Sequence, residues 1–278
     1  MTTHADITPL TRGRAAEIGF LRRAGRSNAH ALVLLHGVGS NAGSFAALMA
    51  ALPPTIDAIA WDAPGYGDSR PLALPSPAPR DYADAVKTFL DALGLSRVTV
   101  AGHSLGALFA GSFAAHFTQN VAALALLSPA LGYRVAAGAA LPPTVQVRID
   151  EVYELGPAAF AAKRAPRLVG DPAANPQIVA AVEKAMAAVH PAGYAQAVLA
   201  LGAGHLISDL AQVSVPALVA VGTKDVITPP DNARRAHDHL KNSVGFHLIG
   251  GAGHALPQDE PAAVAHLLTQ LVENHADG

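Results

Sequence analysis

The sequence predicts an α/β protein with a mostly parallel central sheet, helices on both faces of the sheet, and a helical cap insertion. Two observations support this fold class. Short apolar runs recur along the chain, and segments of helical length separate them. The alternation also stops between about residues 130 and 209 and then resumes, which indicates an insertion between two strands of one sheet.

Six short apolar runs are predicted as buried strands of the sheet. The first, "ALVLL", breaks at His36-Gly37, and the second ends in the turn-rich stretch "DAPGYGDS". Such runs, bounded by loop-forming residues, are typical of parallel strands covered on both faces. An upstream segment, Ile18–Arg23, is predicted to add an antiparallel edge strand. In chain order the six runs cover residues 31–35, 56–61, 97–101, 121–127, 216–221 and 244–249.

Helical patterns follow most of these runs and supply the connections that parallel strands require. Their presence between successive strands favours a sheet covered by helices on both sides. The five predicted helices cover residues 42–51, 79–93, 105–118, 230–240 and 261–274.

The segment from Ala130 to Asp209 contains Pro, Gly and alanine-rich helical stretches and no predicted buried strand. Its clearest helix is "PQIVAAVEKAMAAV", residues 176–189. Because the strand pattern resumes at Pro216, we expect residues 1–129 and 210–278 to form the core and residues 130–209 to form a cap over the site. The alanine, leucine and valine content of the cap favours a mostly apolar pocket.

Composition predicts a globular protein without nucleic-acid or membrane partners. Of 278 residues, 51% are hydrophobic and 14% are charged, and 19 Lys and Arg against 21 Asp and Glu give a net charge of −2. The opening residues Met1–Asp6 lack the basic start of a secretory signal, and no apolar stretch approaches the roughly 20 residues of a spanning helix. We therefore expect a cytoplasmic protein. With no cysteine and no metal-binding histidine motif, no metal site is expected. The chemistry predicted below for Ser104 implies no other cofactor.

The stretch "GHSLG" places Ser104 between an apolar run and a helical segment. On a sharp strand-to-helix turn, small residues at Gly102 and Gly106 relieve backbone crowding and the serine hydroxyl projects from the carboxyl end of the sheet. This context predicts a nucleophile.

Two later residues are predicted to activate that serine. Asp225 in "TKDVITPP" follows the strand that ends near Val221, and His254 in "GGAGHALP" follows the strand that ends near Ile249. Because the carboxyl ends of parallel strands meet at one edge, both should lie near Ser104. A serine needs a base to remove its proton, and the base needs a third group to hold it in one tautomer.

Two backbone amides are predicted to form an oxyanion hole. Leu105 N–H lies at the start of a helix, and Val38 N–H lies in the glycine-containing loop "HGVGS". In the same loop, His36 is predicted to stabilise the backbone rather than react.

These motifs resemble the α/β-hydrolase fold family, in the cap-bearing branch of esterases, enol-lactonases and carbon–carbon bond hydrolases. The resemblance extends from about residue 16 to the C-terminus and rests on "HGVG", "WDAPGYGDS", "GHSLG", Asp225 and Gly253-His254. The chain order Ser, Asp, His is that of the family. A serine at position 104 argues against the dehalogenase and epoxide hydrolase branches, which use an aspartate nucleophile.

Other polar residues have structural interpretations beside the functional ones. Asp62 competes with Asp225 for the acid role, but the resemblance implies that it is structural, and His103 is predicted to point away from Ser104. We expect the cap histidines and arginines to be exposed, although an arginine would be needed to bind a substrate carboxylate. They are His190, His205, Arg134, Arg148, Arg164 and Arg167.

The predicted function is that of a serine hydrolase that cleaves an ester, lactone or related carbonyl bond of a small, mostly apolar substrate. Two alternatives stay open. A carbon–carbon bond hydrolase of aromatic ring-cleavage products is one, although the resemblance implies Gly-Pro, Asn and Trp where this chain has Gly39-Ser40, His103 and Ala255. The other is a small-molecule receptor that keeps the three residues and turns over slowly.

Overall fold

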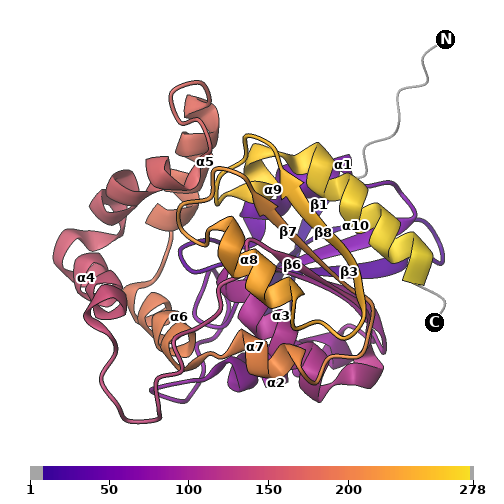
Figure 1. The fold of residues 1–278 in the computed structure, drawn as a ribbon, viewed down its shortest axis with the longest axis horizontal. Helices are drawn as coiled ribbons and strands as arrows, with labels where there is room; N and C mark the ends of the chain where they lie inside the picture. Colours follow the sequence, from indigo (N-terminus) through magenta and orange to yellow (C-terminus); the bar gives the residue numbers. More distant parts are fainter. Residues whose placement is uncertain (1–8, 276–278) are drawn as a thin grey trace.

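A computed structural model describes residues 9–275, which form one eight-stranded sheet with helices on both faces (Figure 1). The strand order is β1-β2-β4-β3-β5-β6-β7-β8. The prediction about a secretory signal concerns Met1–Asp6, which lies outside the described residues. Within residues 9–275, no helix has both the length and the apolar character needed to cross a membrane.

The six predicted strands are all present and begin and end within two residues of the predicted positions. They run parallel to one another, so their carboxyl ends lie at one edge of the sheet. Every residue of β4 to β7 is buried, which explains their uninterrupted apolar runs. The strands are β3 (His30–Leu35), β4 (Ile56–Trp61), β5 (Val98–His103), β6 (Val121–Leu127), β7 (Ala217–Gly222) and β8 (Ser243–Ile249).

One prediction about the sheet edge is wrong. The segment β2 (Ile18–Arg23) is antiparallel to β4, as predicted, but it is not an edge strand. A further strand, β1 (Leu10–Ala15), pairs with β2 and forms the edge. Its residues are mostly exposed, so it lacks the apolar run by which the other strands are recognised.

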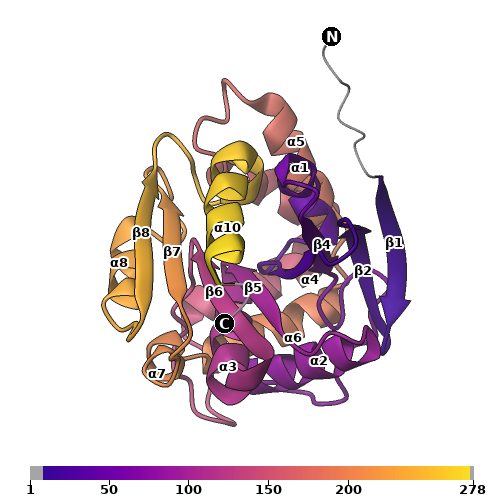
Figure 2. The same ribbon diagram turned by 90° about the vertical axis from the view of Figure 1, so that its right-hand side faces the viewer.

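Helices cover both faces of the sheet (Figure 2). The core between α1, α10 and the sheet is separate from the core that contains α2, α3 and α8. The predicted helix over residues 42–51 is a 3₁₀ turn, η1 (Ala42–Phe45), followed by α1 (Ala46–Ala51). The others are α2 (Pro79–Ala92), α3 (Leu105–His116), η2 (Thr118–Asn120), α8 (Pro230–His237), α9 (Leu256–Asp259) and α10 (Pro261–His275).

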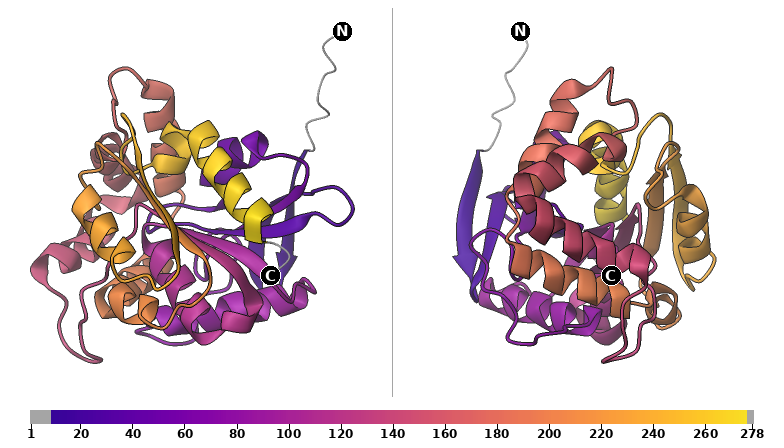
Figure 3. Two further views of the ribbon diagram at one scale, coloured as in Figure 1. Left: turned by 45° about the vertical axis from the view of Figure 1, so that its right-hand side comes forward. Right: turned by 90° about the vertical axis from the view of Figure 1, so that its left-hand side faces the viewer.

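The chain between β6 and β7 forms helices and, within the described residues, no strand. The predicted helix over residues 176–189 is α5, which ends at Ala187. In Figures 1 and 3 the segment from α4 to α6 lies to one side of the sheet. The longest helix, α4, is interrupted at Gly156, which has φ 73°, and at the following Pro157. The segment comprises α4 (Pro143–Arg164), η3 (Ala165–Leu168), α5 (Pro176–Ala187), α6 (Pro191–Ala203) and α7 (Leu206–Leu210).

Candidate active site

Ser104 occupies the sharp turn between β5 and α3. Its backbone has φ 55° and ψ −115°, a conformation that L-residues rarely adopt. A Cβ on Gly102 would lie 2.2 Å from the Gly106 carbonyl oxygen, and one on Gly106 would lie 2.0 Å from the Leu35 carbonyl oxygen. The turn therefore requires glycine at both positions, which is why the two flank the serine.

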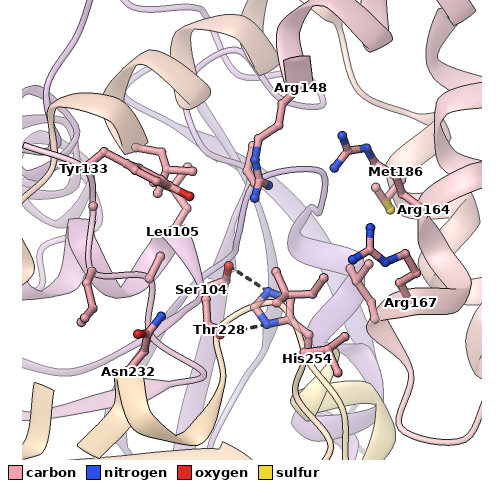
Figure 4. Close-up of a pocket in the computed structure, with 18 of the residues that line it drawn as sticks. Ser104, Leu105, Tyr133, Arg148, Arg164, Arg167, Met186, Thr228, Asn232 and His254 are labelled. Carbon is pink, nitrogen blue, oxygen red and sulfur yellow. Dashed lines mark hydrogen bonds between the residues drawn. The ribbon is translucent and has the colours of Figure 1, made fainter. Parts of the chain in front are cut away.

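The side chains of Ser104, His254 and Asp225 form a hydrogen-bonded series. Ser104 Oγ lies 3.0 Å from His254 Nε2 (Figure 4), and His254 Nδ1 lies 2.9 Å from Asp225 Oδ2. The three residues follow β5, β8 and β7, and all three are buried. Parallel strands thus bring together residues that are 150 positions apart in the sequence.

The partners of Asp225 fix the direction of the hydrogen bonds in this series. Burial by itself raises the pKa of Asp225, but the hydrogen bond from His254 and the amides of Thr228 and Ile227 outweigh it and lower the pKa to about 2. An ionised carboxylate only accepts hydrogen bonds. His254 Nδ1–H therefore donates to Asp225, which leaves Nε2 free to accept the proton of the Ser104 hydroxyl.

Thr228 is a polar neighbour of this series that the sequence analysis did not identify. Its hydroxyl oxygen lies 3.0 Å from Asp225 Oδ2, 3.1 Å from His254 Nδ1 and 2.9 Å from the Ser128 carbonyl oxygen. Its backbone amide donates to Asp225 Oδ1 at 2.9 Å. Thr228 could have been predicted from its spacing, because it lies three residues after Asp225 at the end of a strand. This spacing is typical of a turn in which an aspartate side chain accepts hydrogen bonds from the following residues.

His103, the last residue of β5, supports the loop that carries His254. Burial and the nearby His254 lower the pKa of His103 to about 3, so the ring is neutral at physiological pH. Its Nε2–H donates to the carbonyl oxygen of His254 at 2.7 Å. The side chain therefore holds the backbone of His254 instead of facing the Ser104 hydroxyl.

Val38 and Leu105, the two residues predicted to supply amide donors, both line the cavity that contains Ser104. Leu105 is the first residue of α3, where an amide has no acceptor within the helix. The loop after β3, which contains Val38, approaches Ser104 closely, because a Cβ on Gly37 would lie 2.8 Å from Ser104 Cβ. His36 ties this loop to the next one by accepting a hydrogen bond from Ala63 N–H at 2.9 Å.

Asp62 has partners other than His254. It is 1% exposed, its Oδ1 accepts from Ala42 N–H at 2.8 Å, and its Oδ2 lies 3.4 Å from Arg12. These contacts join the loop after β4 to η1 and β1. Of the two candidate aspartates, Asp225 is the one beside the imidazole.

A cavity of about 350 Å³ opens over Ser104 and His254. Arg148, Arg164 and Arg167 point into it from the segment between β6 and β7 (Figure 4), and Arg235 joins them from α8. The lining is therefore mixed in polarity and cationic, so the expectation of a mostly apolar pocket is wrong. The other residues singled out in that segment, Arg134, His190 and His205, are absent from this lining within the described chain.

Residues 26–261 match the family described as serine aminopeptidase, S33. The chain is 29% identical over 264 residues to a pimeloyl-(acyl-carrier protein) methyl ester esterase of Neisseria meningitidis, an alignment that covers 86% of this chain and 92% of that protein. A shorter match, 35% identical over 108 residues, is to a 2-hydroxy-6-oxononadienedioate/2-hydroxy-6-oxononatrienedioate hydrolase of Pseudomonas putida and covers 37% and 38% of the two chains.

Among solved structures, the enol-lactonase from Burkholderia xenovorans LB400 is similar in fold. The TM-score is 0.81 at 21% sequence identity, with 95% of this chain and all of that chain covered (100%). At this identity the likeness concerns the fold, and it extends over both the sheet and the inserted helices.

Proposed function

The chain belongs to the serine aminopeptidase, S33, family and has the α/β-hydrolase fold, and on this basis we propose that it is a serine hydrolase that cleaves an ester, lactone or related carbonyl bond. The observation that carries the proposal is the series of hydrogen bonds from Ser104 through His254 to Asp225. A buried carboxylate, an oriented imidazole and a serine hydroxyl in that order are the components of nucleophilic acyl transfer.

In the proposed reaction, Ser104 Oγ attacks the substrate carbonyl carbon while His254 Nε2 takes the hydroxyl proton. Asp225 accepts from Nδ1–H and stabilises the imidazolium that forms. His254 then returns the proton to the leaving oxygen, and the acyl group stays on Ser104. Water, deprotonated by His254, cleaves this acyl-enzyme and restores the serine.

Negative charge that develops on the carbonyl oxygen requires donors that are already in place. We assign this role to the backbone amides of Val38 and Leu105. The position of Leu105 at the N-terminus of α3 adds the favourable end of the helix dipole.

Residues 130–209 are proposed to act as a lid on this site. The arginines that they place over Ser104 give the lid a way to select substrates, while the reacting groups belong to the loops at the edge of the sheet. Substitutions in the lid should therefore change substrate preference more than they change attack on a small activated ester.

Replacement of Ser104 tests the reaction directly. Ser104→Ala should lower kcat on p-nitrophenyl esters by about 10⁴-fold or more, and the urea midpoint of unfolding should stay near the wild-type value. A fluorophosphonate probe should label wild-type protein at Ser104, as peptide mass spectrometry would show.

Labelling at another serine, or undiminished hydrolysis by Ser104→Ala, would remove the assignment of the nucleophile. Labelling at Ser104 without steady-state turnover on esters and lactones would instead favour the slow receptor.

A carbon–carbon bond hydrolase is the second candidate, and the arginines over Ser104 are the observation that favours it. The Pseudomonas putida relative hydrolyses dioates, as its name states, and an acidic substrate needs a cationic partner when it leaves water. Comparison of kcat/KM on an acidic vinylogous diketone and on a neutral ester separates the two candidates. Ser104-dependent turnover of the diketone alone would replace the esterase proposal.

A further inference from the structure

Four arginines share one cavity with the proposed nucleophile. Arg148 comes from α4, Arg164 from the last turn of α4, Arg167 from η3 and Arg235 from α8. Figure 4 shows that Arg148 extends toward Ser104, with Arg164 and Arg167 around the same space. Among the described residues that line the cavity, none is Asp or Glu.

The carboxylate that pairs with one of these arginines does not balance their charge. Glu151 forms ion pairs with Arg164 and, at 2.6 Å, with Lys163, so one negative charge already serves two cations. Arg148 and Arg167 have no ion-pair partner within residues 9–275. The surplus positive charge therefore lies on the side chains that face the cavity.

Arg148 differs from an ordinary surface arginine. Its side chain is half-buried, and its Nε is fully buried without a hydrogen-bond partner. A polar donor withdrawn from water without an acceptor destabilises the folded protein. An anion bound in the cavity would supply a counter-charge for the guanidinium group of Arg148.

We propose that the substrate of this hydrolase carries a free carboxylate, which Arg148 and Arg167 bind while Ser104 attacks a carbonyl group elsewhere in the same molecule. This inference rests on the proposed function. The planar guanidinium group binds carboxylates in a bidentate manner. A cavity of about 350 Å³ is the size of a small-molecule site, so the substrate is a small acidic ester or lactone.

A matched pair of substrates tests the proposal. The neutral member is p-nitrophenyl hexanoate, and the acidic member is mono-p-nitrophenyl adipate, in which a carboxylate replaces the terminal methyl group. We expect wild-type protein to favour the acidic member in kcat/KM. Arg148→Gln or Arg167→Gln should lower the acidic-to-neutral ratio by about 10- to 100-fold, as expected for loss of a charge-assisted hydrogen bond. Arg148→Lys should restore part of the ratio.

Arg134→Gln is the control variant, because Arg134 lies in the same inserted segment but does not line the cavity within the described chain. Its ratio should equal that of the wild type. An equal loss in Arg134→Gln would show that the net charge of the segment, rather than a defined subsite, sets the preference, and would overturn the proposal.

A binding measurement separates failure of this inference from failure of the proposed function. Adipate should bind to Ser104→Ala protein in calorimetry and should bind more weakly when Arg148→Gln is added. Ser104-dependent hydrolysis of both esters at equal kcat/KM, together with no adipate binding, would overturn the inference and leave the hydrolase standing. Hydrolysis that does not depend on Ser104 would overturn the function, while adipate binding would still test the arginines. Binding of hexyl phosphate in preference to adipate would overturn the choice of a carboxylate.

Discussion

Asp225 and Asp62 are both buried aspartates that follow strands of the sheet, and their different partners give them different roles. Asp225 accepts hydrogen bonds from His254, Thr228 and Ile227, so its charge acts on the imidazole. Asp62 accepts from Ala42 and lies near Arg12, so its charge joins loops. The same residue type thus has different roles because its neighbours differ, although both aspartates follow parallel strands at one edge of the sheet.

Asp225→Asn should lower kcat by about 10⁴-fold, because an amide favours the wrong tautomer of His254. It should also lower the unfolding free energy at neutral pH, because the ionised carboxylate stabilises the folded state. Asp62→Asn should lower the unfolding free energy by about 1 to 2 kcal/mol, since it weakens a buried charged acceptor, and should lower kcat much less. Ester hydrolysis and urea denaturation of both variants measure these effects. A folded but inactive Asp62→Asn beside an active Asp225→Asn would reverse the assignment.

The three residues of the proposed catalytic series, Ser104, His254 and Asp225, were predictable because each follows a strand that is recognisable from its apolar run. Strand ends, chain order and the glycines around Ser104 indicated these residues, and the family resemblance favoured Asp225 over Asp62. Arg148 and Arg167 did not have such a signal. Whether an arginine faces solvent or a cavity depends on how the inserted helices pack over the sheet, and no local pattern records that packing.

The hairpin of β1 and β2 shows why one strand escaped prediction. Its two-residue turn, Ala16-Glu17, has φ values of 46° and 64°, the left-handed conformation that two-residue hairpins require. Asn-Gly is the usual sequence for such a turn, and Ala-Glu gives no turn signal. Tertiary pairing with β2 overrides the local preference of these residues.

Ala16→Asn combined with Glu17→Gly should raise the unfolding free energy by about 1 kcal/mol, because both new residues adopt left-handed backbone at lower cost. Chemical denaturation measures the change. Glu17→Ala is the control, since it also removes the exposed pair between Arg14 and Glu17 but keeps a side chain at positive φ. Equal stabilisation by both variants would show that the turn conformation is not the cause.

The positions of two arginines on α4 could not be predicted from the helical period of the sequence. The break at Gly156 and Pro157 divides α4 into two parts, and Arg148 and Arg164 lie on opposite sides of the break, yet both line the cavity. A single helical period cannot place both residues on one face. Their convergence follows from the packing of α4 on α5 and α6, which is a tertiary property.

For the molecule as a whole, net charge says little about local charge. The chain carries a net charge of −2, yet its cavity is lined by four arginines and, among the described residues, no carboxylate. The dependence of folding on pH likewise comes from individual groups with displaced pKa values rather than from the total. Two of them, Asp209 and Asp225, have pKa values displaced in opposite directions.

Asp225 stabilises the folded state above the usual carboxyl range. Its pKa falls from 3.8 to about 2 on folding, so the folded state binds its proton less readily than the unfolded state. The stabilisation is complete above about pH 4 and is lost as pH falls toward 2. Asp209 in α7 has the opposite sign, because burial raises its pKa to about 6 and His116 only partly opposes this effect.

Asp209 therefore destabilises the folded protein at neutral pH, where it holds a partly desolvated charge, and this effect disappears as pH falls from about 6 to 4. Asp209→Asn should raise the unfolding free energy at pH 7.5 by on the order of 1 kcal/mol, allowing for the exposed part of the side chain. At pH 4 the difference should be much smaller, because the folded wild-type chain is then protonated at this position and the unfolded chain is close to half protonated. Urea denaturation of both proteins from pH 4 to 8 measures the difference. A stabilisation of the same size at pH 4 and at pH 7.5 would contradict a raised pKa at Asp209. It would instead assign the effect to packing or hydrogen bonding of the amide.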